Sequence, residues 1–250
     1  MLMYSKDDNV VTRQELNDMR PDIIKLHTRS HKPVPFGDAI DLVHDEVERA
    51  GFIVGDEQHV LARKQTQLFS MLELQNVRDK FRKICVAVRH SINKTLSLQV
   101  AIAKTLLICT NLSLWAREFI ARKNTRFVSR DIRAMIRGYV GRIDTFIADD
   151  TERTARYQSA LLADPVANHT IIRMLQNGVI NTQRVETVVN EFYNPSHVEH
   201  LNENGERTAW TLFNAATESF KGSPISTYTE RCNGLHAQVD QAATYALRNA

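Results

Sequence analysis

The sequence predicts an α+β fold, with a small antiparallel sheet in the N-terminal half and a mostly helical C-terminal half. Gly and Pro number 9 and 6 in 250 residues, together about half their usual share of roughly 12%. This scarcity favours helices and disfavours a many-turned β-sandwich. Strand-like apolar runs precede residue 112, and apolar residues at helical spacing follow it. We therefore expect one α+β domain over residues 1–250, with a sheet-containing part at about 36–112 and a helical part at about 113–250.

The first half is expected to combine one helix with several strands. Residues 1–35 are expected to be mostly irregular, because Pro21, Pro33 and Pro35 interrupt them. Apolar residues at helical spacing predict a helix over Asp38–Ala50, which Gly51 ends. Strands are expected at Phe52–Val54, His59–Arg63, Thr66–Leu74 and Phe81–Ile92, with a hairpin turn at Asn93-Lys94. The next run, Thr95–Thr110, fits either a return strand or a buried helix.

Beyond Asn111 the apolar residues recur at helical spacing. A helix is expected over Ser113–Arg122, and Ser129 can cap another that runs to about Ala148. A polar loop is expected over Asn194–Glu206. Further helices are expected at about 152–163, 168–177, 182–193, 207–221 and 226–248.

The formal net charge of +3 is unevenly distributed along the chain. Residues 1–62 hold 7 basic and 12 acidic residues, a net charge of −5. Residues 63–142 hold 17 basic and 4 acidic residues, a net charge of +13. Residues 143–250 hold 8 basic and 13 acidic residues, again −5. A basic middle segment of this kind points to a polyanionic partner.

Five arginines of the basic segment share a regular spacing. Arg122, Arg126, Arg130, Arg133 and Arg137 follow one another at intervals of 4, 4, 3 and 4 residues. On one continuous helix this spacing would place them in a single stripe. Arginine binds phosphate bidentately and also stacks on bases. The stripe therefore predicts contacts with the phosphates of a nucleic acid.

Further cations and interleaved rings complete the predicted nucleic-acid interface. Cations that follow the backbone and rings that stack on bases are typical of proteins that bind a single strand. The alternative is that the rings belong to the core and that the acidic flanks pair with the cations. The predicted interface consists of Arg78, Lys80, Arg82, Lys83, Arg89, Lys94, Arg117, Arg122, Lys123, Arg126, Arg130, Arg133 and Arg137, with Trp115, Phe127 and Tyr139 as stacking rings.

The sequence carries no catalytic, cofactor or metal-binding signature. It contains no Walker A, GxGxxG, GxSxG or HExxH motif, so we expect a non-enzymatic protein without catalytic residues or a cofactor. His27 with His31, and His197 with His200, are spaced as metal ligands on a helix would be. Nearby prolines place both pairs in expected loops, and no third ligand is evident, so no metal site is predicted.

Cysteine use and hydropathy indicate a cytoplasmic protein. Cys85, Cys109 and Cys232 form no CxxC pair and are expected to be buried thiols in a reducing compartment. The first residues lack the apolar stretch of a signal peptide. No apolar run reaches the ~18–20 residues that a membrane span needs, so no membrane contact is expected.

Four short stretches follow an order that has a counterpart in a known family. Arg89–Thr95 is a polar hairpin, Ile108–Asn111 contains a Cys-x-Asn step, and Arg122–Arg126 contains a basic-Thr step. Thr208–Glu218 is similar to a Trp-x-x-Tyr-Asn-Ala-x-Thr-Glu segment, with Phe213 in place of the Tyr. Together, loosely over residues 34–235, they resemble a phage/plasmid-like protein family of unknown function, although the usual His-Asp of its hairpin is absent. The resemblance implies a phage origin and thus the host cytoplasm, but no activity.

The size and the basic middle segment are also similar to those of the single-stranded-DNA-binding RNA polymerase cofactors of N4-like phages. We therefore predict a phage-encoded single-stranded DNA-binding protein, a non-enzymatic cofactor in transcription, replication or recombination. A phage RNA polymerase is a candidate partner, and a homo-oligomer is left open. The alternative is a factor that binds a host or phage protein through its charge asymmetry.

Overall fold

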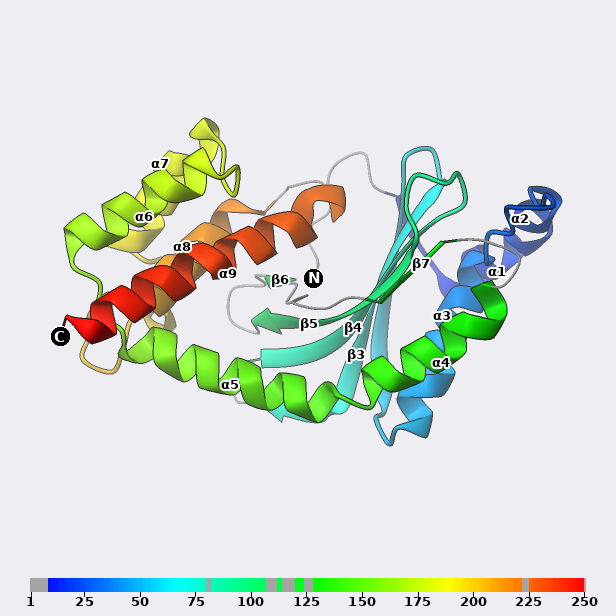
Figure 1. Cartoon of the computed structure of the whole chain (residues 1–250), viewed down its shortest axis with the longest axis horizontal. Helices are drawn as coiled ribbons and strands as arrows, with labels where there is room; N and C mark the ends of the chain where they lie inside the picture. The colour runs from blue at the N-terminus through cyan, green and yellow to red at the C-terminus, as the bar shows by residue number, and fades with distance from the viewer. Residues whose placement is uncertain are drawn as a thin grey trace. The chain divides into compact units, whose positions relative to one another are not determined.

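The computed structural model describes residues 9–79, 82–106, 112–113, 120–123, 128–221 and 225–249 (Figure 1). Its contacts divide the chain into two compact units. Of the described residues, the sheet unit holds 9–79, 82–105, 120–123 and 128–144, and the helical unit holds 106, 112–113, 145–221 and 225–249. A sheet in the N-terminal half and helices in the C-terminal half confirm the predicted α+β class.

An antiparallel sheet forms the centre of the sheet unit. Its strands follow the order β1 (Asn9–Val11), β2 (Val54–Ala62), β3 (Gln67–Asp79), β4 (Arg82–Ser91) and β5 (Leu98–Leu106), and β7 (Ile120–Arg122) pairs with β5. The register places Ala62 opposite Gln67, and Gln67 opposite Ser91. The sequence left Thr95–Thr110 open between a strand and a helix, and in the structure its residues Leu98–Leu106 form a strand. Apolar β4 residues such as Val86 and Val88 are fully buried.

The expectation that residues 1–35 are mostly irregular is wrong for residues 9–25, which hold β1 and two short helices. Thr12 and Glu15 form a reciprocal capping box that starts α1 (Arg13–Asp18). Pro21 lies in the first turn of α2 (Arg20–Lys25). A backbone N–H in the first turn has no partner within the helix, so the missing N–H of proline costs no hydrogen bond there. The proline thus starts a helix here and does not interrupt one.

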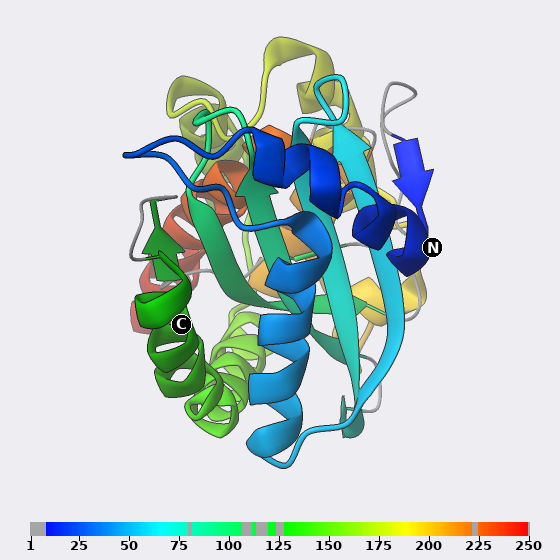
Figure 2. The ribbon, with the colours of Figure 1, turned by 90° about the vertical axis from the view of Figure 1, so that its right-hand side faces the viewer.

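Two longer helices complete the sheet unit. Figure 2 shows α3 (Phe36–Arg49) lying across one face of the sheet. Its buried stripe includes Phe36, Ile40, Val43 and Val47, as the helical spacing predicted. α4 (Val128–Val140) contacts α3 and β7.

The arginine-rich region departs from the sequence prediction in two ways. Ile120–Arg122 is the strand β7, so the helix expected over Ser113–Arg122 is wrong at its described C-terminal end. The helix expected from Ser129 to Ala148 is two helices, α4 and α5 (Ile143–Ser159), separated at Gly141-Arg142. Because Arg122 lies in a strand, the five arginines do not form one continuous helical stripe.

The helical unit is built around a buried central helix. α8 (Ala209–Ser219) has every residue buried except Glu218, and it contacts α7 (Thr182–Tyr193) and α9 (Ile225–Arg248). α6 (Asp164–Gln176) contacts α7 and α9, and the short helix η1 (Val198–His200) precedes α8. The helices expected at 168–177, 182–193, 207–221 and 226–248 are confirmed, with small shifts at their ends. The two-residue strand β6 is Leu112–Ser113.

Candidate nucleic-acid interface

Four basic segments converge at one end of the sheet. The register places the β2–β3 turn beside the end of β4 and thus beside the β4–β5 loop, as Figures 1 and 2 show. Because Leu98 pairs with Arg122, the end of β7 lies there too. The loop after α2 joins them through the His31 ring, whose Nε2 lies 3.0 Å from the carbonyl oxygen of Ile92.

Exposed cations cluster on these segments. We define the basic rim as Arg29, Lys32, Arg63, Lys64, Lys94 and Lys123, all of which are exposed. No carboxylate in the described part of the chain pairs with any of them. Residues 80–117 and 58–72 of the sequence contain no Asp or Glu at all. Within the described part of the chain, the positive charge of the basic rim is therefore not neutralised by a paired carboxylate.

Histidines hold the loop after α2 in place. His90 is fully buried on β4, and its Nε2 lies 2.8 Å from the carbonyl oxygen of Val34. His27 Nε2 contacts the carbonyl oxygen of Pro33 at 3.0 Å within the loop. Since a carbonyl oxygen only accepts, each Nε2 carries the proton and donates. Arg29 and Lys32 thus extend from a loop that is fixed to the sheet.

Side-chain hydrogen bonds also shape the two turns of the basic rim. The hydroxyl of Ser91 accepts from the backbone N–H of Leu96 at 2.8 Å, and the Gln67 amide donates to the Thr95 hydroxyl at 2.9 Å. The Asn93 amide donates to the Thr66 hydroxyl at 2.9 Å, which joins the two turns directly. Lys94 has a φ of 69°, in the left-handed region that non-glycine residues seldom adopt.

A cleft of about 620 Å³ opens within the basic rim. Its lining combines two lysines, three hydroxyl side chains and one histidine, and no acidic residue takes part. Lys94 from the β4–β5 loop and Lys123 from the end of β7, both members of the predicted interface, line the cleft. The lining residues are Ser30, His31, Lys94, Thr95, Leu96, Ser97, Ala121 and Lys123. Ammonium groups beside hydroxyl donors are what a phosphate group needs for charge and hydrogen bonds.

A second cavity that borders the same loop has mixed charge. It measures about 510 Å³ and is lined by Arg20, Lys32 and Arg133 but also by Asp38 and Asp41. Arg20 is hydrogen-bonded to Asp38 at 3.0 Å. The acidic side chains make this cavity a poorer site for a polyanion than the rim cleft.

Two of the predicted arginines are paired with acidic residues of α3. Arg137 Nε donates to Glu46 Oε2 at 2.8 Å, and Arg133 donates to both Glu46 and Asp45 at 3.2 Å. The Glu46 side chain is fully buried. The Arg137 hydrogen bond lowers the pKa of Glu46 below its usual value, against the effect of burial. This is the pairing with an acidic flank that the sequence left open as the alternative.

The remaining members of the predicted interface fall into three groups. The Lys83 ammonium pairs with the Glu73 carboxylate at 2.7 Å. Arg89 lies on β4 and interacts with other residues there, so it is not a free cation. The backbones of Arg78, Arg82, Arg122 and Arg130 lie in β3, β4, β7 and α4. Lys80, Arg117, Arg126, Trp115 and Phe127 lie outside the described residues.

The prediction that Tyr139 stacks on bases is wrong. Its side chain is 1% exposed, and its hydroxyl accepts from the backbone N–H of Ile102 at 3.1 Å. A ring packed against the sheet in this way belongs to the core and offers no face to a base.

Sequence reasoning missed four residues of the basic rim. Arg29 and Lys32 fall in the segment whose net charge is −5, and Arg63 and Lys64 fall in a turn outside the predicted clusters. A count over a shorter window would have indicated Arg29 and Lys32, because residues 23–37 contain three cations and no acidic residue. A net charge summed over 62 residues concealed it.

Neither a cluster of metal ligands nor a helix that could cross a membrane is present among the described residues. His27 and His31 bind backbone carbonyls, and no three His, Cys, Asp or Glu side chains in this part of the chain gather as metal ligands would. No helix in the same residues is long and apolar enough to cross a membrane. Cys85 and Cys232 are buried free thiols as predicted, and Cys109 lies outside the described residues.

Comparisons with protein-family models, with curated proteins and with solved structures find no match to this chain. The resemblances to the phage/plasmid-like family and to the N4-like cofactors therefore stay predictions. The geometry of the basic rim is therefore what points to a function.

Proposed function

We propose that this protein binds single-stranded DNA through the basic rim, with Lys94 and Lys123 contacting phosphates in the cleft. The observation that carries the proposal is the cleft itself: its two lysines have no carboxylate partner among the described residues, and none of its lining residues is acidic. Elsewhere in the sheet unit, Arg13, Arg20, Arg133 and Arg137 are each paired with Asp or Glu. The contrast favours a polyanion at the basic rim.

The concave site favours a single strand over a duplex. A flexible strand can turn its phosphates into a cleft, whereas the phosphates of a rigid duplex lie on a convex rod that touches only its edges. With Tyr139 in the core, the proposal assigns binding to phosphate contacts and expects little sequence preference. In a phage-infected cell such a protein would act as a non-enzymatic cofactor in transcription, replication or recombination, with a phage RNA polymerase as candidate partner.

Fluorescence anisotropy with labelled single-stranded DNA, duplex DNA and RNA of equal length tests the proposal. The single strand is expected to bind most tightly, with similar affinity for unrelated sequences. Duplex preference, or no binding of any nucleic acid at low salt, would overturn it. If a pull-down from lysate retains the same protein partners after nuclease treatment, and DNA does not bind, a protein-binding function replaces the proposal.

A further inference from the structure

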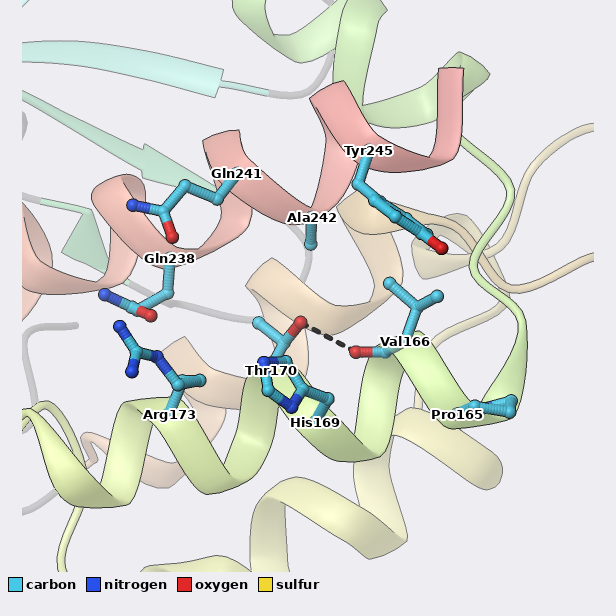
Figure 3. Close-up of a pocket in the computed structure, with 9 residues that line it drawn as sticks. All are labelled: Pro165, Val166, His169, Thr170, Arg173, Gln238, Gln241, Ala242 and Tyr245. Carbon is cyan, nitrogen blue, oxygen red and sulfur yellow. Dashed lines mark hydrogen bonds between the residues drawn. The ribbon is translucent and has the colours of Figure 1, made fainter. Parts of the chain in front are cut away.

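The helical unit contains a pocket of about 460 Å³ between α6 and α9. Figure 3 shows its lining side chains converging from the two helices. Val166, Thr170 and Arg173 lie on one face of α6, and Gln238, Ala242 and Tyr245 lie on one face of α9. The volume is within the range of roughly 300–1,000 Å³ that small-molecule sites occupy. The pocket has the size of a ligand site and lies within one unit.

Polar groups occupy this contact where apolar side chains would normally fill it. Gln238 is only 9% exposed, yet no protein group in the described residues hydrogen-bonds its amide. The amide nitrogen and oxygen still reach solvent, so they are available to hydrogen-bond a ligand in the pocket. Thr170 differs, since its hydroxyl donates to the Val166 carbonyl at 2.7 Å.

The pocket has a cationic end and an aromatic end. Arg173 has no carboxylate partner among the described residues, and none of the lining residues is acidic. In Figure 3 its guanidinium points toward the Gln238 amide, and Tyr245 lies at the far side of the pocket. Tyr245 is 58% exposed, so its ring is accessible to a ligand. Tyr245 follows Gln238 by seven positions in α9, which is about 10 Å along a helix.

We propose that this pocket binds an adenine mononucleotide. Arg173, with the Gln238 amide beside it, would take the phosphate, Tyr245 would stack on the base, and Gln241, one turn before Tyr245 on α9, would bind the base edge. Glutamine amides match the donor and acceptor of adenine, and rings stack on bases. One guanidinium suits one phosphate group better than a triphosphate. The proposal is independent of the basic rim, since all nine lining residues belong to the helical unit.

Isothermal titration calorimetry on the full chain tests this proposal with adenosine monophosphate, adenosine and inorganic phosphate. The nucleotide is expected to bind at least about tenfold more tightly than either part, because it uses both ends of the pocket. Arg173→Gln should weaken the nucleotide about tenfold and leave adenosine nearly unchanged. Tyr245→Ala should weaken both ligands that carry the base.

Arg248→Gln is the matched control, because it removes the same charge from α9 at a residue that does not line the pocket. Arg173 and Tyr245 are exposed, so the variants should keep the wild-type circular dichroism spectrum and melting temperature. No nucleotide binding, equal binding of phosphate alone, or a loss that Arg248→Gln reproduces would overturn the proposal. A 5′-phosphorylated oligonucleotide titrated in parallel shows whether the same pocket takes a free nucleotide or the end of a strand.

Discussion

His90 on β4 donates a hydrogen bond from Nε2 to the carbonyl oxygen of Val34, 2.8 Å away and 56 residues earlier in the chain. The imidazole is fully buried and packs edge-on against Phe36 at a centroid distance of 5.7 Å. This pair fixes the loop that carries Arg29 and Lys32 to the sheet. The order of that half of the basic rim therefore depends on a histidine that stays neutral.

Stability should fall with acid because of His90. Burial lowers the pKa of His90 from its usual 6.5 to about 4, so the unfolded chain takes up this proton at a higher pH than the folded protein does. The contribution of His90 is complete above pH 6.5 and is lost as the pH falls from 6.5 toward 4. Over this range the free energy of unfolding should decrease by about 3 kcal/mol because of His90. Urea unfolding at a series of pH values measures this decrease.

His90→Gln keeps an amide donor for the Val34 carbonyl but cannot titrate. Between neutral pH and about pH 4, the free energy of unfolding of the variant should fall by about 3 kcal/mol less than that of the wild type. His200, whose pKa burial likewise lowers to about 4, remains in both proteins and cancels in the comparison. An identical pH dependence in the variant would show that His90 does not titrate as its burial implies.

The β2–β3 turn should become more stable when its backbone strain is relieved. Arg63, Lys64 and Gln65 have φ values of 52°, 57° and 62°, all in the left-handed region. Gln65→Gly should raise the free energy of unfolding by about 0.5–1 kcal/mol, because glycine adopts this region without steric cost. Gln65→Ala, which keeps a Cβ, should give no such gain. Equal stabilities of the two variants in urea unfolding would contradict this account of the turn.

Arginines of α4 should matter little for DNA binding. Glu46 neutralises Arg137 from within α3, so Arg137→Gln should change the affinity for single-stranded DNA by less than about twofold. Glu46→Gln leaves Arg133 and Arg137 without that neutralisation and should strengthen binding about threefold. Anisotropy at fixed salt measures both effects. If Arg137→Gln weakens binding as much as Lys94→Gln does, α4 belongs to the interface after all.

Local patterns predicted much of the fold. The spacing of Ile40, Val43 and Val47 predicted α3, and the alternation around Val86 predicted β4. The N-terminal helices were missed because prolines were interpreted as breakers, although Pro21 occupies a helix start where it is favoured. The helix expected up to Arg122 failed because β5 recruits Ile120–Arg122 as a strand, which is a tertiary effect.

The site was harder to predict than the fold. Lys94 and Lys123 were identified from charge, but the regular arginine spacing gave more weight to Arg133 and Arg137, which Glu46 and Asp45 neutralise. That pairing joins residues about 90 positions apart, and no local pattern contains it. The four missed cations of the basic rim come together only through strand register and through the His31 contact with Ile92.

The most direct test of the central claim is the salt dependence of single-stranded DNA affinity in Lys94→Gln/Lys123→Gln. The double variant should bind about tenfold more weakly, and its slope of log K against log salt should be shallower by about 1.4, since each lost phosphate contact removes roughly 0.7. The control Lys25→Gln/Lys221→Gln removes two lysines that are paired with Asp22 and Glu218, and it should match the wild type. A slope and affinity unchanged in the Lys94/Lys123 variant would contradict the assignment of the cleft as the DNA site.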